Sequence, residues 1–241
     1  TAQNTNDWMA ASDFSLQQAG DIAQRAIAGV MRGLSDTMGP EARITIAEEI
    51  DGMLKEAIDI ANTKHLDRYI FSGFTTDLRP FKEERTDPLD PDRITSVVYK
   101  ENNTAFQPIR RDIGPGETIT VNIDGYTTFK NLLDTLISVR DSLMANDLVT
   151  LREEDALNLD AALNQVTLAT TVNGSRMRDL DNAQDRISQS NVEIKALIAQ
   201  KDEANIAEIT AELANQENIY QTVVMISSRT QSMVNLFESL G

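Results

Sequence analysis

The stretch HLDRYIFSGFTT, residues 65–76, lies where the pattern of the sequence changes. The chain before it shows helical periodicity, whereas most of the prolines and several short runs of β-branched residues follow it. The stretch contains the chain's only histidine, His65, together with three aromatic residues and one glycine. It is therefore either an active-site loop or a structural turn at which a helical rod becomes something else, and the flanking sequence decides between them.

The N-terminal side of the stretch has the spacing of amphipathic helices. Apolar side chains recur every three or four positions over residues 13–34, as they do on one helix face. Gly39-Pro40 interrupts the pattern, and a proline is tolerated at the first position of a new helix. A second stripe runs from Ile44 to Ala61. The sequence predicts two helices joined by a short break.

Residues 77–128 have a different composition and contain five of the chain's six prolines. Two runs within them, SVVY at 96–99 and TITVNI at 118–123, are rich in β-branched residues. The second run alternates apolar and polar side chains, as half-buried strands do. Turn signals flank it, with GPG at 114–116 and DG at 124–125. We predict a small β-rich insertion with its own apolar face.

Helical spacing returns at Phe129, and a heptad-like register without proline then runs from Leu159 to Leu197. Gly174 lies inside this register, at a local cost of about 1 kcal/mol relative to alanine. A second stripe follows over residues 206–237, and its last part is apolar on more than one face. We therefore predict a long helix that packs along a neighbour and needs a further partner near its end.

The fold class that these patterns predict is mainly α with a β-rich insertion: a long antiparallel helical rod plus a small projecting β lobe. Neither helical half buries its apolar stripe alone, so the two halves must pack together. The predicted parts are residues 1–76 and 129–204 as the two halves of the rod, 77–128 as the inserted lobe, and 205–241 as a C-terminal helix.

The composition excludes several classes of partner and of site. Asp and Glu outnumber Lys and Arg by 38 to 22, which gives a formal net charge of −16. Nucleic acids and anionic membranes require clustered cations, so we expect neither as a partner. The absence of cysteine excludes disulfides, thiolate zinc sites and cysteine nucleophiles. No apolar run reaches the length of a membrane span, and no cleavable signal peptide is visible.

No catalytic, cofactor-binding or metal-binding residues are predicted. His65 lacks a second histidine or a cysteine to form a metal site, and it is interpreted as a surface or helix-end residue. Asp87, Asp90 and Asp92 lie in a predicted solvated loop, 81–92, whose prolines and missing glycine do not fit a calcium loop. No phosphate-binding or nucleophile-elbow motif occurs. A carboxylate-dependent hydrolase would require clustered acidic residues with shifted pKa values.

Three segments together resemble the flagellar hook–filament junction family, hook-associated protein 3, within the flagellin superfamily. The first is ANTKHLDRYIFSGFTT at 61–76, followed by RPF at 79–81, although Asp67 stands where the family often has glycine. The second, TTVNGSRMRDL at 170–180, is similar to the superfamily's Val-Gly-Ala-Arg-Met-Asn-Arg-Leu segment. The third, 206–240, is similar to the family's closing helix. The order and spacing of the three are more specific than any one alone.

The resemblance implies a structural axial protein of the extracellular bacterial flagellum, without catalysis. Its implied partners are the hook-side junction protein (hook-associated protein 1), flagellin, further copies of itself in a ring, and an export chaperone. The implied rod is a flagellin-like core domain whose first half ends in a β-hairpin arm, formed by Tyr69, Ile70 and Phe71 and closed near Gly73. The structural or assembly residues that we predict are Tyr69, Ile70, Phe71, Gly73, Gly174, Arg176, Met177, Tyr220 and Phe237.

Two alternatives remain open at this point, a filament flagellin and, more remotely, the carboxylate-dependent hydrolase. A flagellin shares the segment from Gly174 to Leu180 and would polymerise alone. The family resemblance also implies a further N-terminal helix, paired with the C-terminal one, that this chain lacks. We therefore expect residues 219–240 to be poorly ordered alone or to pack against another copy.

Overall fold

The structure, a computed structural model, describes residues 2–100, 106–114 and 116–238, except for the side chains of residues 2, 3, 204 and 227–238. It divides into two units, Thr1–Gln184 and Asp185–Gly241. The predicted boundary between residues 204 and 205 stays a prediction. The first unit contains all the strands and most of the helices, while the second is a single stretch of helix.

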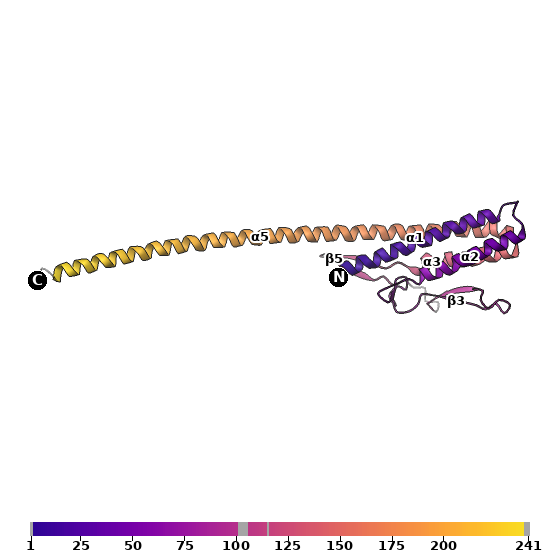
Figure 1. Cartoon of the computed structure of the whole chain (residues 1–241), viewed down its shortest axis with the longest axis horizontal. Helices are drawn as coiled ribbons and strands as arrows, with labels where there is room; N and C mark the ends of the chain where they lie inside the picture. Colours follow the sequence, from indigo (N-terminus) through magenta and orange to yellow (C-terminus); the bar gives the residue numbers. More distant parts are fainter. Residues whose placement is uncertain (1, 101–105, 115, 239–241) are drawn as a thin grey trace. The chain divides into compact units, whose positions relative to one another are not determined.

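Helices of the first unit run alternately in opposite directions (Figure 1). They are α1 (Ala2–Gly33), α2 (Pro40–Ala61), α3 (Gly125–Ala145) and the first part of α5 (Ala156–Glu238). The predicted break is confirmed, since Gly39 is the N-cap of α2 and Pro40 lies at its first turn. The helix expected from residue 13 begins earlier, within the first residues of the chain. The mainly α architecture is therefore confirmed.

Asp124-Gly125 was expected to form a turn, and that expectation is wrong. Asp124 is instead the N-cap of α3, and its carboxylate accepts a hydrogen bond from the Thr127 hydroxyl at 2.6 Å. The helix thus begins inside the predicted insertion. It ends at Asn146, which has a left-handed conformation with φ 55°, as helix C-termini commonly do. Short helix α4 (Leu148–Thr150) and a π-helical turn (Leu151–Asp155) then lead into α5.

Among the described residues, the strands form three separate two-stranded antiparallel sheets. They pair as β1 (Lys64–His65) with β2 (Arg68–Tyr69), β3 (Phe81–Glu84) with β4 (Ser96–Tyr99), and β5 (Arg110–Gly114) with β6 (Glu117–Thr120). The predicted strand at 96–99 is confirmed, and the run at 118–123 is a strand only as far as Thr120. Within the described residues the insertion therefore has no common sheet.

The hairpin in the opening stretch closes at a different place from the one expected. Lys64 pairs with Tyr69, so the turn consists of Leu66 and Asp67 and does not lie near Gly73. Both turn residues have positive φ angles, 48° and 61°, as two-residue hairpins with the right-handed strand twist require. This conformation explains why glycine suits position 67, and aspartate is among the few other residues that tolerate it.

The main core lies between the inner faces of α1, α2, α3 and the first part of α5. A smaller apolar cluster contains Met9 of α1, Ile119 and Val121 at the β6 end, and Leu180 of α5. The β5–β6 hairpin is therefore fixed against two of the rod helices. Arg43, which is 5% exposed, donates from Nε to the Gly33 carbonyl at the end of α1 and thereby stabilises the α1–α2 connection.

Helix α5 has a buried face only in the first unit. One face of it is buried there, at Leu159, Ala162, Val166, Leu180 and Ala183, which confirms the predicted packing for this part of the register. From Asp185 to Ile226, every side chain that the structure describes is exposed. No helix in the described part of the chain is both long enough and apolar enough to cross a bilayer.

Candidate assembly site

Five aromatic rings form a continuous cluster where the helices meet the β hairpins. Phe71 lies 4.6 Å from Phe129 of α3 between ring centroids, and Phe81 of β3 lies 6.0 Å from Phe129. Tyr99 of β4 extends the cluster, 5.0 Å from Phe81 and 5.5 Å from Tyr126. Such tilted and edge-to-face pairs contribute roughly 0.5–1.5 kcal/mol each beyond burial. The opening stretch is therefore part of a buried joint between rod and lobe.

Helix α3 approaches this joint so closely that its first residue has to be glycine. A Cβ atom at Gly125 would lie 2.2 Å from the Phe71 carbonyl oxygen and 2.8 Å from the Phe71 Cβ. Neither atom can move without shifting the backbone of the opening stretch. The Asp124-Gly125 pair thus combines a helix cap with a contact that only a missing side chain permits.

Two polar side chains, Asn62 and Tyr99, also hold this joint together by hydrogen bonds. Asn62, which follows α2, donates from its amide to the Phe81 carbonyl at 2.9 Å and accepts from the Phe81 N–H at 3.0 Å. The Tyr99 hydroxyl donates to the Phe71 carbonyl at 3.2 Å. Burial, reinforced by the charge of Asp124, raises the pKa of Tyr99 to about 12. The phenol therefore remains protonated at neutral pH and keeps this hydrogen bond.

Arg140 of α3 is completely buried and connects the rod to the lobe. Its guanidinium donates to Asp51 of α2 at 2.9 Å, to the neighbouring Asp141 at 2.8 Å and to the Ile94 carbonyl at 2.7 Å. Asp141 also pairs with Arg93 of the lobe at 2.7 Å. A buried charge with three partners is expensive to disrupt, because removing it leaves those partners unpaired.

Asp51 forms a second ion pair with Lys55 of the same helix, with 2.7 Å between the Lys55 Nζ and the Asp51 carboxylate. Burial raises the pKa of the Asp51 carboxyl, but the hydrogen bonds and charges of Lys55 and Arg140 outweigh burial and bring the pKa below its ordinary value. The carboxylate is therefore ionised throughout the neutral range, and its attraction to Arg140 depends on pH only under acidic conditions.

Residues 170–180 of α5, the segment that resembles the flagellin superfamily, contact both α1 and the lobe. Asn173 is fully buried and donates to the Met9 carbonyl of α1 at 2.9 Å. Arg176 donates to the Asn122 carbonyl at 3.0 Å, and burial lowers the pKa of its guanidinium. Met177 packs against the smaller apolar cluster. A Cβ atom at Gly174 would meet only the flexible end of Arg178, at 3.9 Å, so nothing in this unit requires that glycine.

Next to the joint lies an open groove of about 700 Å³ between the start of α1 and two hairpins, β1–β2 and β5–β6. Three cationic side chains line it, Arg68, Arg110 and Arg111, and its lining contains no carboxylate. Leu66 and Phe74 provide exposed apolar surface at the groove, with exposed fractions of 73% and 66%. We call this surface the cationic groove.

Trp8 and His65 meet in the wall of the cationic groove, edge to face with ring centroids 6.0 Å apart. The indole N–H of Trp8 and Nε2 of His65 are buried and have no hydrogen-bond partner in the described part of the chain. His65 is thus a half-buried residue of β1, four positions after the last residue of α2. It has no carboxylate beside it in the groove lining, so the groove offers no acid–base pair.

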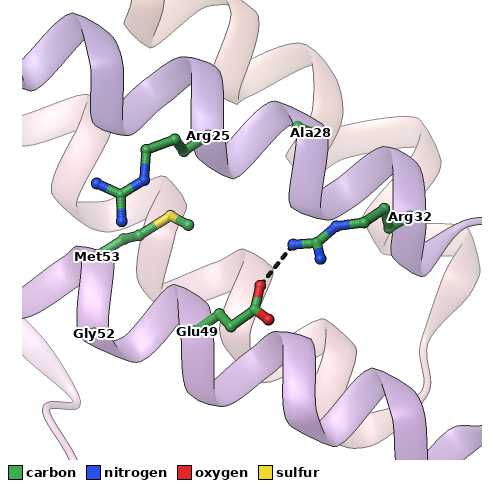
Figure 2. A pocket seen from close by; sticks show the side chains of 6 residues that line it. All are labelled: Arg25, Ala28, Arg32, Glu49, Gly52 and Met53. Atoms are coloured by element: carbon green, nitrogen blue, oxygen red, sulfur yellow. Dashed lines mark hydrogen bonds and ion pairs between the residues drawn. The ribbon is translucent and has the colours of Figure 1, made fainter.

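A second hollow, of about 450 Å³, lies on the surface between α1 and α2 (Figure 2). Ala28 and Gly52 are small and so leave room for this hollow. An ion pair between Arg32 and Glu49, at 2.6 Å, crosses it. Arg25 also reaches over it. Exposed pairs of this kind stabilise a fold by less than about 1 kcal/mol. The hollow has the character of a helix–helix surface and not of a reaction site.

The residues that the structure describes contain no cluster of metal-ligating side chains. No group of three or more His, Asp or Glu side chains among them could hold a metal ion. Several of their ion pairs connect different structural elements, such as α1 with α2 and α3 with the lobe. What the described surface does offer is apolar and cationic contact area, in the cationic groove and along α5.

The predicted site residues lie in three places: the joint, strand β2 and helix α5. Ile70 and Phe71 are fully buried in the joint, and Gly73 occupies a left-handed turn with φ 60°. Tyr69, in β2, lies under the ammonium of Lys64 at 4.6 Å. Arg176 and Met177 hold α5 to the lobe, Gly174 lies beside them without a required contact, and Tyr220 is 70% exposed. The side chain of Phe237 lies outside the described residues.

The sequence reasoning missed Arg140, Asn173 and the arginines of the cationic groove. For Arg140 a signal existed, since it occupies an apolar helix face, four residues after Leu136 and three before Leu143. A charged residue in such a stripe has to find buried partners. For Arg110 and Arg111 there was no comparable signal, because their position beside α1 depends on how distant segments pack.

No protein-family model matches this chain, and no curated protein matches it. Solved structures do match it. FlgL of Bacillus cereus is 21% identical with a TM-score of 0.65, and the match covers 79% of this chain and 88% of that one. Flagellar hook-associated protein 3 of Legionella pneumophila is 12% identical with a TM-score of 0.70, over 83% and 93% of the two chains.

FlgL of Xanthomonas campestris gives a further match, 13% identical with a TM-score of 0.57, over 79% of this chain and 92% of that one. The matched share includes most of both chains in each comparison, so the likeness concerns the architecture as a whole and not one motif. At these identities the likeness concerns the fold. The chain therefore has the fold of the solved FlgL and flagellar hook-associated proteins.

Proposed function

We propose that this chain is a structural subunit of the bacterial flagellum, at the junction between the hook and the flagellin filament. The observation that supports this most strongly is the shared fold, which extends over 79–83% of the chain in the three matches. Three motif segments of the sequence point to the same family. No catalysis is proposed.

The roles of the motif residues support a mechanical function. Phe71 packs on Phe129 of α3, and Arg176 of α5 donates to the Asn122 carbonyl, so contacts of this kind join the lobe to the rod, as a subunit that transmits torque requires. The exposed apolar side chains of α5, among them Leu213 and Tyr220, fit a helix that packs against neighbours in an assembly. The proposed neighbours are the hook-side junction protein, flagellin and further copies in a ring, after export with a chaperone to the cell exterior.

The experiment that tests this function uses the full-length chain, with purified hook-side junction protein and flagellin added separately. Sedimentation and electron microscopy follow the assembly. We expect binding to the hook-side partner and to flagellin, without filaments from the chain alone. Filaments formed by the chain alone would instead identify it as a flagellin, and failure to bind either partner would refute the junction role.

A further inference from the structure

The cationic groove has a charge opposite to that of the protein as a whole. The chain's formal net charge is −16, yet Arg68, Arg110 and Arg111 line this groove without an acidic residue. Arg68 donates to the Thr76 hydroxyl at 3.0 Å, and Arg110 and Arg111 have no ion pair in the part of the chain that the structure describes. Cationic side chains with apolar neighbours favour an acidic ligand with an apolar side chain.

A loop of the same chain has that chemistry. The segment DPLDPD, residues 87–92, connects β3 with β4 and contains three aspartates and two prolines. Leu89 at its tip is 94% exposed, and the Asp92 side chain is 99% exposed. We call this segment the acidic loop. Leu89 thus adds one exposed apolar side chain to a loop that is otherwise acidic.

Contacts within the subunit already hold the acidic loop in one conformation before it binds a partner. Asp87 accepts a hydrogen bond from the Leu89 N–H at 2.9 Å, and Asp90 accepts one from the Asp92 N–H at 3.2 Å. At its base, Arg93 pairs with Asp141 of α3 at 2.7 Å. The two prolines further restrict the backbone. Little conformational entropy is lost when a loop of this kind binds, so a small contact suffices for specific recognition.

We propose that the cationic groove of one copy binds the acidic loop of a second copy. Leu89 then packs between Leu66 and Phe74, and the carboxylates of Asp90 and Asp92 pair with Arg110 and Arg111. The two surfaces belong to different elements, so each copy can donate a loop to one neighbour and accept a loop from another, which is a heterologous arrangement. Repetition of such a contact generates a ring where the rotation between neighbouring copies closes, and an open filament where it does not. This inference deepens the proposed function, on which it rests.

Cross-linking between two separately labelled copies tests the contact directly. The chain has no cysteine, so one copy is given Leu89→Cys, another Leu66→Cys, and the two are mixed under mild oxidation. A disulfide requires Cα atoms within about 7 Å, so we expect the mixed dimer to form at least about tenfold faster than in the control mixture. The control pairs Leu89→Cys with Val149→Cys, an equally exposed position in α4 that is 65% accessible.

Charge reversal provides an independent test. Arg110→Glu with Arg111→Glu in one copy, or Asp90→Lys with Asp92→Lys in another, is expected to slow the cross-link at least about tenfold when paired with the unaltered surface. Combining the two reversed surfaces restores the rate, because their charges are again opposite. Salt at about 0.5 M slows the unaltered pair, since it screens exposed charges.

The proposal is overturned if the mixed dimer forms no faster than the Val149→Cys control, both in concentrated solution and after addition of the hook-side junction protein. It is also overturned if the two reversed surfaces fail to restore the cross-link. Binding to the hook-side protein is measured in the same samples. Binding without the cross-link refutes this contact alone, whereas the cross-link without binding refutes the junction role alone.

Discussion

The joint between the rod and the lobe and the distal part of α5 contain similar apolar residues but use them in opposite ways. In the joint, Phe71, Phe81 and Phe129 are fully buried against one another. Between residues 185 and 226 of α5, isoleucine, leucine and valine recur at helical spacing, yet every described side chain is exposed. The difference teaches that helical periodicity identifies an apolar stripe without saying whether its partner lies in the same chain.

The two regions should therefore respond differently to mutation. In the joint, a substitution acts on the folding of the isolated chain, because every contact is internal. In the distal part of α5, a substitution leaves the folding of the chain nearly unchanged and acts on assembly. Five substitutions test this contrast.

Phe129→Ala is expected to have the largest effect. The ring lies at the centre of the aromatic cluster, in contact with Phe71 and Phe81 and without solvent exposure. Removing it leaves a cavity, and we expect a loss of about 4 kcal/mol in the free energy of unfolding. Denaturant titration measures it, with Phe74→Ala as the control at an exposed position, where the change should stay within about 0.5 kcal/mol. Equal effects would refute the buried joint.

Gly125→Ala tests the close approach of α3 to the opening stretch. The added Cβ would overlap the Phe71 carbonyl oxygen, 2.2 Å away, so helix and hairpin have to separate. We expect a loss of about 3 kcal/mol, at the upper end of overpacking effects. Gly52→Ala is the matched control, since a Cβ atom added at this position of α2 would have nothing within 4 Å. This variant should stabilise the chain by about 0.5–1 kcal/mol. A neutral Gly125→Ala would contradict the contact.

Arg140→Met keeps most of the volume of the side chain but removes its charge. We expect a loss of about 2 kcal/mol, less than for a fully buried pair because Asp51 and Asp141 are partly exposed and can bind water. The effect also depends on pH. The pKa of Asp51 is lower in the folded chain than in the unfolded one, so its stabilisation is present above the unfolded value, near 3.8, and is lost as the pH falls through the folded value.

The cost of Arg140→Met should accordingly be constant at neutral pH and shrink under acidic conditions, as the pH falls below the unfolded pKa of Asp51 and through its lower folded pKa. Unfolding titrations of both proteins at pH 7 and at acidic pH measure this difference. A cost that stays the same across the acidic range would show that the ion pair with Asp51 contributes little to the role of Arg140.

The sequence was sufficient for α1, α2, most of α3 and the first part of α5, because each of these buries a stripe whose spacing is visible locally. It was sufficient for the strand at 96–99 as well. It was not sufficient for the hairpin turn, since a Leu66-Asp67 pair with two positive φ angles has no strong local signal, whereas Gly73 does. Gly125 was read as a turn residue for the same reason. What makes glycine necessary there is the backbone of Phe71, and only the folded chain brings that backbone close.

Gly174→Ala distinguishes a folding requirement from an assembly requirement at a predicted site residue. Within the chain, the new methyl group meets only the end of Arg178, and glycine costs about 1 kcal/mol in a helix interior. We therefore expect the free energy of unfolding to rise by about 1 kcal/mol. If Gly174 serves assembly, the same variant binds the hook-side partner more weakly, and pull-down assays measure this. A destabilised monomer would instead show that α5 needs the glycine for its own packing.

Leu213→Gln should have the smallest effect on folding and thereby marks the other end of the comparison. Leu213 is 61% exposed, and glutamine has a helix propensity close to that of leucine, so the free energy of unfolding should change by less than about 0.5 kcal/mol. Binding to the proposed partners should nevertheless weaken, because an apolar contact in the assembly is lost. Glu212→Gln, one position away on the same helix, is the control and should affect neither measurement. If Leu213→Gln destabilised the isolated chain as strongly as a joint variant does, the distal stripe would have its partner within the same chain, and the contrast between the two regions would disappear.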